Sequence, residues 1–149
     1  ADRVWTTIWA QPKRWPRRQC LVPAALDRAQ PAPGLVERLS SWLAEETAEA
    51  PTLPANATRD RRLGCDCPPC SEVNAFLAHP IAMEHTLRVR QSLRRHVRDQ
   101  ARYAGADLRF QTIRKSSPFP MVCTKTTDSA EARIDRYEAD IAALTELRG

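Results

Sequence analysis

Three cysteines within six positions constrain this chain more than any other feature of its sequence. They lie in Cys65-Asp-Cys-Pro-Pro-Cys70, which has the form C-x-C-x-x-C. A tetrahedral zinc ion takes about four soft or borderline ligands, and closely spaced cysteines supply several of them from one tight turn. Pro68-Pro69 stiffens that turn because proline fixes the backbone angle φ. We therefore expect zinc as a cofactor, with Cys65, Cys67 and Cys70 among its ligands.

The total number of cysteines supports a metal more than a disulfide framework. The chain has five cysteines, and an odd number leaves one without an intramolecular partner. A redox C-x-x-C motif is the alternative, but thiol oxidoreductases place its first cysteine at a helix start after a strand. Here an additional cysteine precedes the motif and no strand is expected before it. We expect a reducing compartment, and hence an intracellular location that is nuclear or cytoplasmic.

The fourth ligand has two candidates. The spacing of Val89, Leu93 and Val97 predicts a long helix over residues 82–104, and His96 falls within its apolar sector. An inward-facing histidine needs a partner for its ring nitrogens, and a metal held by the cysteines would provide one. His79 is closer in sequence and remains the alternative ligand. The structural alternative for His96 is a core histidine bonded to a backbone carbonyl.

The remaining patterns predict an α+β fold. Residues 4–9 alternate as a strand, residues 35–49 have helical periodicity, and residues 71–78 form a short helix before Pro80. Residues 108–111 and 119–124 predict a β-hairpin. A C-terminal helix follows, with Asp128 and Glu131 as a variant capping box and an apolar stripe that we expect to cover the hairpin.

These elements suggest three segments. Residues 1–50 form a Trp- and Pro-rich N-terminal segment with one short helix, and residues 51–63 form a linker containing Pro51 and Pro54. Residues 64–149 form the zinc-binding α+β module, with a long Arg-rich helix, a β-hairpin and a C-terminal helix. Because the chain begins at Ala1 without a methionine, we expect a monomeric module of a larger chain.

Arginines gather on one side of the predicted long helix. At ~100° per residue they cover about half of its circumference, opposite the apolar face. The six residues are Arg88, Arg90, Arg94, Arg95, Arg98 and Arg102. Such a surface can neutralise phosphates, so we select Arg90, Arg94, Arg95 and Arg98 as candidate nucleic-acid ligands. The alternatives are a solvated face or a surface for an acidic protein partner. No aromatic residue is interleaved, so we do not expect base stacking here.

The sequence contains no recognisable set of catalytic residues. The net charge is +5, which speaks to binding and solubility and does not define a reaction. No Gly-rich phosphate loop or G-x-S-x-G motif is present, and no stretch approaches the ~20 apolar residues of a membrane span. We therefore expect a non-enzymatic zinc-binding interaction module that contacts nucleic acid through its Arg-rich helix, without a membrane partner. The alternative is a protein–protein interaction domain in which zinc is purely structural.

Several short motifs follow one another after residue 63. In order they are Cys65-Asp-Cys-Pro-Pro-Cys70, Asn74-Ala-Phe-Leu77, Arg94-Arg-His96 and Val122-Cys-Thr-Lys125. This order resembles the C-terminal region of a group of uncharacterised fungal and algal proteins, over about residues 63–147 and without the Trp/Pro-rich start. The resemblance implies His96 as the fourth ligand and similar domain limits. It implies no activity or substrate.

Overall fold

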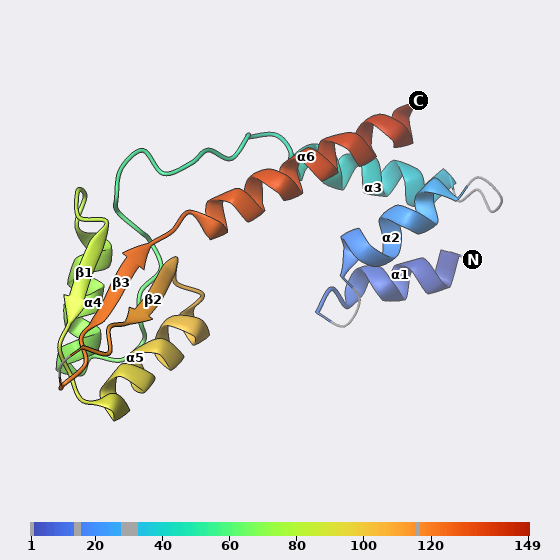
Figure 1. Cartoon of the computed structure of the whole chain (residues 1–149). Helices are drawn as coiled ribbons and strands as arrows, with labels where there is room; N and C mark the ends of the chain where they lie inside the picture. The colour runs from blue at the N-terminus through green and yellow to red at the C-terminus, as the bar shows by residue number, and fades with distance from the viewer. Residues whose placement is uncertain (1, 14–15, 28–32, 116) are drawn as a thin grey trace. The chain divides into compact units, whose positions relative to one another are not determined.

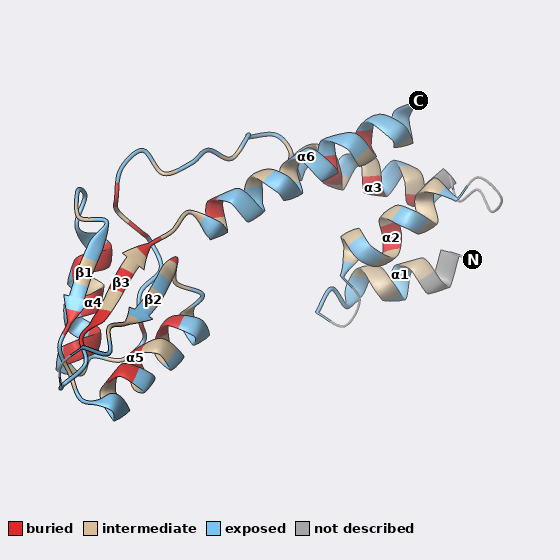
Figure 2. Ribbon diagram, viewed as in Figure 1, coloured by how far each residue is buried: buried red, intermediate tan, exposed pale blue. Residues whose placement is uncertain are grey.

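The computed structural model describes residues 2–13, 16–27, 33–115 and 117–149. Across these residues the chain forms six helices and one three-stranded antiparallel sheet (Figure 1), which confirms the α+β class. The chain divides into two compact units. One is Ala1–Pro51 together with Ala132–Gly149, and the other is Thr52–Glu131. We call them the helical unit and the sheet unit, and each has buried residues of its own (Figure 2).

The sheet unit contains the predicted hairpin. Its strands are β1 (Glu84–Leu87), β2 (Leu108–Thr112) and β3 (Met121–Lys125), in the order β1-β3-β2. In β3, Met121, Cys123 and Lys125 are buried and the residues between them are half-buried, as alternation in a strand requires. Phe110 and His85 both pair with Cys123 from opposite sides, so these three residues share one face of the sheet.

Two helices cover that face of the sheet. They are α4 (Pro68–Ala78) and α5 (Gln91–Ala104). Val73 and Leu77 of α4 and Val97 of α5 belong to the same hydrophobic cluster as Met121 and Cys123. A single core therefore holds the cysteine-bearing helix and the arginine-bearing helix on one sheet.

The prediction of one long helix over residues 82–104 is wrong at its N-terminal end. Residues 84–87 form strand β1, and the helix begins only at Gln91. Arg90 occupies the N-cap without a capping hydrogen bond from its side chain, so no local signal marks the start. Strand β1 instead exists because its backbone pairs with β3, more than 30 residues away in the sequence.

The helical unit contains α1 (Asp2–Ala10), α2 (Arg17–Leu26), α3 (Pro33–Glu46) and most of α6 (Asp128–Arg148). The strand expected at residues 4–9 is therefore wrong. Trp5 and Trp9 are four residues apart, a spacing that fits one face of a helix as well as one face of a strand. Ile8 joins them against the core, which favours the helical period.

Helix α6 packs differently from the expectation. Its residue Leu144 is buried in the cluster that contains Leu21, Leu39 and Leu43, so this part of its apolar stripe does not cover the hairpin. At its start, Thr127 rather than Asp128 hydrogen-bonds to Glu131, because Thr127 is the residue that precedes the first helical turn.

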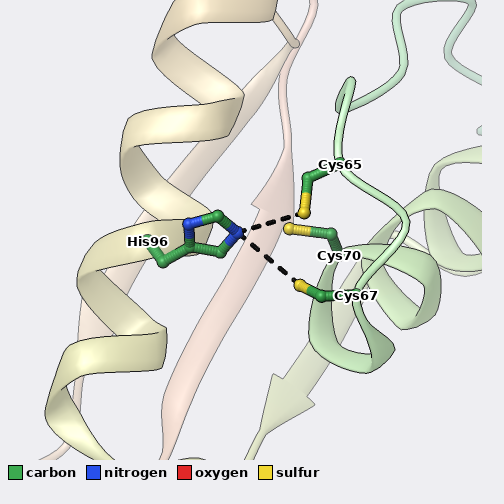
Figure 3. Close-up of side chains that lie close together, drawn as sticks. All are labelled: Cys65, Cys67, Cys70 and His96. Carbon is green, nitrogen blue, oxygen red and sulfur yellow. Dashed lines mark hydrogen bonds between the residues drawn. The ribbon is translucent and has the colours of Figure 1, made fainter.

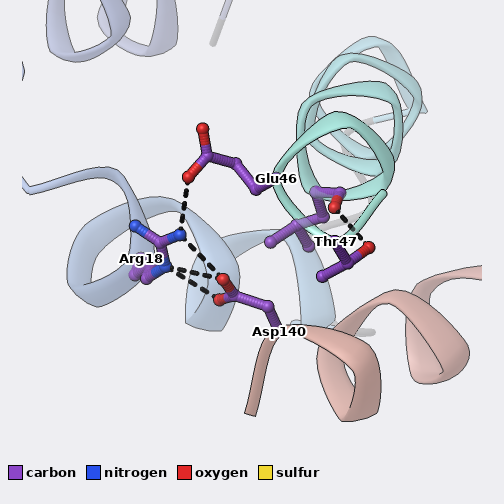
Figure 4. A network of polar contacts seen from close by, with 5 residues as sticks. Arg18, Glu46, Thr47 and Asp140 are labelled. Carbon is purple, nitrogen blue, oxygen red and sulfur yellow. Dashed lines mark hydrogen bonds and ion pairs between the residues drawn. The ribbon is translucent and has the colours of Figure 1, made fainter. Parts of the chain in front are cut away.

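An arginine cross-links three helices of the helical unit (Figure 4). Arg18 of α2 donates from Nε to Asp140 of α6 at 2.8 Å, and from Nη2 to Asp140 at 2.7 Å and Glu46 of α3 at 2.9 Å. The hydrogen bonds from Arg18 to Asp140 raise the pKa of the guanidinium, which stays charged. Bidentate pairs of this kind are stronger than neutral hydrogen bonds and fix the orientation of both side chains.

Residues 51–63, expected as a linker, form no helix or strand. Three of them are nevertheless buried, namely Ala57, Arg59 and Leu63. The N–H groups of Ala57 and Arg59 donate to the carbonyls of Pro80 and Leu77. The second half of this segment is thus held against the end of α4 within the sheet unit and leads to Cys65. Among the described residues, no helix combines the length and apolar character needed to cross a bilayer.

Candidate metal centre

The four residues predicted as zinc ligands lie together in the sheet unit (Figure 3). One ligand atom from each of Cys65, Cys67, Cys70 and His96 lies within 4.8 Å of the others. Nε2 of His96 is 3.3 Å from the Cys65 sulfur and 3.6 Å from the Cys67 sulfur. With zinc–sulfur and zinc–nitrogen bonds of about 2.3 and 2.0–2.1 Å, a tetrahedral site places sulfur and nitrogen about 3.6 Å apart. The spacing of these atoms fits a metal site.

Hydrogen bonding alone accounts less well for this arrangement. A histidine Nε2 carries at most one hydrogen, which can point at one sulfur only. Here the same nitrogen faces two sulfurs from different positions in the loop, and the third sulfur lies within the same cluster. A cation at the centre would satisfy all four atoms at once, which a single proton cannot do.

Local interactions fix the loop that presents the cysteines. Cys67 is the N-cap of α4, followed directly by Pro68 at the first helical position, and Cys70 lies in the first turn. Ser71 donates from Oγ to the Asp66 carbonyl at 2.9 Å. Upstream, the Asn74 side chain accepts from the Leu63 N–H at 2.8 Å and donates to the Leu63 carbonyl at 3.0 Å. The loop is therefore shaped by the chain itself.

The thiols differ in their acidity. The Cys70 backbone N–H donates to the Cys67 sulfur and lowers the pKa of that thiol, as expected at a helix N-terminus. Burial raises the pKa of Cys70 to about 12, and the neighbouring Cys67 adds to the effect. Cys70 is fully buried, so a thiolate there needs a cation beside it. A divalent metal would supply that charge.

The three histidines have different surroundings. His96 extends from α5 toward the sulfurs (Figure 3). His79 is exposed at the end of α4, and its Nδ1 accepts from the N–H groups of Ile81 and Ala82. His85 on β1 hydrogen-bonds to Glu72 at 2.7 Å. The structure thus brings His96 to the cysteines, whereas the side chain of His79, the alternative ligand, accepts hydrogen bonds from the backbone of the turn that follows it.

The candidate nucleic-acid ligands do not form one uniform surface. Arg95 and Arg98 line a groove of about 600 Å³ between α5 and residues of β2 and the segment after it, which we call the arginine groove. Its lining residues are Gln91, Arg94, Arg95, Arg98, Asp99, Arg102, Thr112, Arg114 and Phe119. Arg90 is exposed but does not line it. The structure therefore separates Arg90 from the arginines of the groove.

Arg94 differs from the expectation of a free surface cation. It is buried, and its Nη1 donates to the carbonyls of Val89 at 2.8 Å and Phe119 at 2.9 Å. Projection of the sequence on a helix could not reveal this, because the covering segment belongs to the connection between β2 and β3. Arg94 therefore holds that connection against α5 and has fewer donors available for a phosphate.

Sequence reasoning missed the groove residues outside α5. Thr112, Arg114 and Phe119 come from β2 and the segment that follows it. The expectation of a face without aromatic residues is therefore incorrect, since Phe119 lies among the arginines. No local signal identifies these positions, because folding of the hairpin onto α5 brings them there.

Comparisons with protein-family models, with curated proteins and with solved structures found no match. The candidate metal centre brings together four side-chain atoms that could bind a metal. The arginine groove has several cations and one aromatic ring.

Proposed function

We propose that the sheet unit is a zinc-stabilised interaction module in which Cys65, Cys67, Cys70 and His96 bind one structural zinc ion. The observation that carries this proposal is the convergence of these four ligand atoms within 4.8 Å, although His96 lies on a different element from the cysteines. Zinc favours thiolate and imidazole ligands in a tetrahedron, and four protein ligands leave no position for a substrate or water. Zinc would then fasten the cysteine loop to α5.

Metal analysis of the purified protein tests this proposal. We expect about one zinc ion per chain, and less than about half of that in Cys67→Ser and in His96→Gln, because three ligands hold zinc more weakly than four. The matched controls are Cys20→Ser, which lies in α2 of the helical unit, and His79→Gln at the end of α4. Both controls should retain the wild-type zinc content.

Two results would contradict the zinc proposal. One is less than half an equivalent of zinc in wild-type protein purified without chelators. The other is an undiminished zinc content in Cys67→Ser. If His79→Gln loses zinc and His96→Gln retains it, the metal is present but the fourth ligand is wrong.

We further propose that the module binds nucleic acid through the exposed arginines of α5. Arg95 and Arg102 expose 86% and 82% of their side chains. Their pairs with Asp99, at 3.9 and 3.3 Å, are solvent-exposed ion pairs of the kind that contribute about 0–1 kcal/mol, so a phosphate can displace them readily. The net charge of +5 favours association with a polyanion. An acidic protein partner is the competing candidate.

Binding to random-sequence DNA and RNA at several salt concentrations tests this second proposal. Each phosphate contact that is removed should lower the slope of log affinity against log salt by about one. We expect such a decrease in Arg95→Ala and in Arg98→Ala. Arg88→Ala is the control, since Arg88 is exposed and lies outside the arginine groove. Affinity that does not fall with salt, or that is unchanged in both variants, would contradict nucleic-acid binding and favour the acidic protein partner.

A further inference from the structure

The arginine groove combines a cationic wall with an aromatic ring. Arg95 and Arg102 are highly exposed, and Arg98 uses one donor on Thr112 Oγ1 at 2.7 Å and keeps others available. Arg114, which is exposed, adds a fourth cation from the segment after β2. Asp99 is the one acidic residue that lines the groove within the described part of the chain. The wall is therefore suited to an anionic, extended ligand.

The aromatic ring in the groove is Phe119, which is 36% exposed. Its backbone carbonyl accepts from Arg94, and the Arg94 guanidinium carbon lies 5.8 Å from the centre of the Phe119 ring. Arg94 is thereby a positioning residue that holds the segment carrying Phe119 against α5. The groove therefore presents an accessible apolar ring beside several cations.

We infer that the arginine groove binds single-stranded nucleic acid, with one base stacked on Phe119 and the backbone phosphates contacted by Arg95, Arg98 and Arg102. This inference rests on the proposed nucleic-acid binding and specifies its form. Proteins that bind single strands combine a cationic groove with aromatic side chains on which bases stack. In a duplex, the bases are already stacked and paired, so Phe119 would have no free base face. An acidic peptide would satisfy the arginines but gives the ring no comparable partner.

Anisotropy of a fluorescein-labelled single-stranded dT15 tests the inference, with a blunt-ended DNA duplex and a polyglutamate peptide as comparison probes. For the single strand, we expect Phe119→Ala to raise Kd on the order of tenfold, within the range measured for stacked bases. Phe119→Tyr should retain affinity, because tyrosine also presents a ring. The control is Ile81→Ala, which removes another exposed apolar side chain, 80% exposed and outside the groove. It should leave Kd unchanged.

The affinity for duplex DNA separates the two proposals. We expect Phe119→Ala to leave duplex binding unchanged, since that binding depends on arginine–phosphate contacts. If the wild type binds dT15 and duplex DNA with equal affinity, and Phe119→Ala changes neither Kd, the stacking of a base on Phe119 is wrong. The proposal of nucleic-acid binding then still stands. If polyglutamate binds more tightly than either DNA probe, both the proposed nucleic-acid binding and the single-strand inference are wrong. Zinc content is measured for every variant, so a lost fold is recognised separately.

Removal of the one acidic group gives a second variant that does not depend on Phe119. Asp99 lies between Arg95 and Arg102 and carries a negative charge into the groove. We expect Asp99→Asn to lower the Kd for dT15 several-fold, because a repulsive charge is removed and two arginines are released. An unchanged or raised Kd would contradict phosphate binding at this groove.

Discussion

Buried charged side chains hold the irregular part of the sheet unit in place. Arg59 is 4% exposed and donates from Nε to the Thr126 carbonyl at 2.6 Å. Its Nη1 donates to the carbonyls of Asn56 at 3.0 Å and Thr58 at 2.9 Å. One side chain thus satisfies two backbone acceptors of its own irregular segment and a third just after β3, and so links the start of the sheet unit to the end of that strand.

Replacement of Arg59 should therefore be costly. Hydrogen bonds to a charged group contribute about 1.5–3 kcal/mol, and removal of the donor leaves carbonyls unsatisfied. We expect Arg59→Ala to lower the free energy of unfolding of the zinc-loaded protein by about 2–4 kcal/mol, measured by urea titration. The neighbouring Arg61 is exposed, and Arg61→Ala should change stability by less than about 0.5 kcal/mol. Equal effects of the two variants would show that the contacts of Arg59 contribute little.

Single residues differed in how well the sequence predicted them. The cysteine spacing carries its own chemistry, so it needed no fold to suggest a metal. His96 followed from its place in the apolar sector of the predicted helix, and the structure brings it to the cysteines. In the helical projection Arg94 falls among the surface arginines, yet the segment that contains Phe119 covers it. Its environment depends on a segment 25 residues away, which no local pattern reports.

At the scale of elements, the ends of α5 show two kinds of boundary. Its start at Gln91 has no side-chain cap, whereas its end has a specific conformation. Gly105 has φ of 62°, and the Ala106 N–H donates to the Ala101 carbonyl while the Gly105 N–H donates to the Arg102 carbonyl. This pair of bonds is a Schellman motif, in which glycine is favoured because other residues are strained at positive φ.

Substitution of Gly105 should reveal that strain. A Cβ atom at this position would lie 4.0 Å from the Arg61 side chain, so space is available and the cost is conformational. We expect Gly105→Ala to lower the free energy of unfolding by about 1–2 kcal/mol, and Gly105→Asn by less. Gly64 lacks a positive φ and has open space around it, so Gly64→Ala is the control and should be neutral. An equally neutral Gly105→Ala, in thermal or urea unfolding, would contradict this assignment.

Whole elements were predicted where one period dominated the sequence. The hairpin and the C-terminal helix are present, although the second strand of the hairpin begins at Met121 and not at residue 119, and the fold class is confirmed. Two predictions of element type are wrong, for different reasons: the strand at residues 4–9 and the helix at residues 84–87. At residues 4–9 a spacing of four satisfied both periods. At residues 84–87 the pairing with β3 determines the strand, and that partner is distant in the sequence.

At the scale of the whole molecule, the described residues form two hydrophobic clusters that have no residue in common. The cluster of the helical unit includes Leu21, Leu39 and Leu43, and that of the sheet unit includes Val97 and Met121. All four candidate metal ligands lie in the sheet unit. A contribution of the metal to stability should therefore be confined to one of the two units.

Metal removal should consequently destabilise the sheet unit alone. Structural zinc contributes about 10–16 kcal/mol in small peptides, and a domain has a net stability of only about 5–15 kcal/mol, so loss of zinc can unfold a small unit. After chelation by EDTA, we expect the amides of Val97 and Met121 to lose protection from hydrogen exchange, while those of Leu39 and Leu43 keep it. Readdition of zinc should restore the lost protection, whereas magnesium should not, because it prefers oxygen ligands. Simultaneous loss in both clusters would show that they unfold as one cooperative body, and no loss in either would show that the metal is dispensable for the fold.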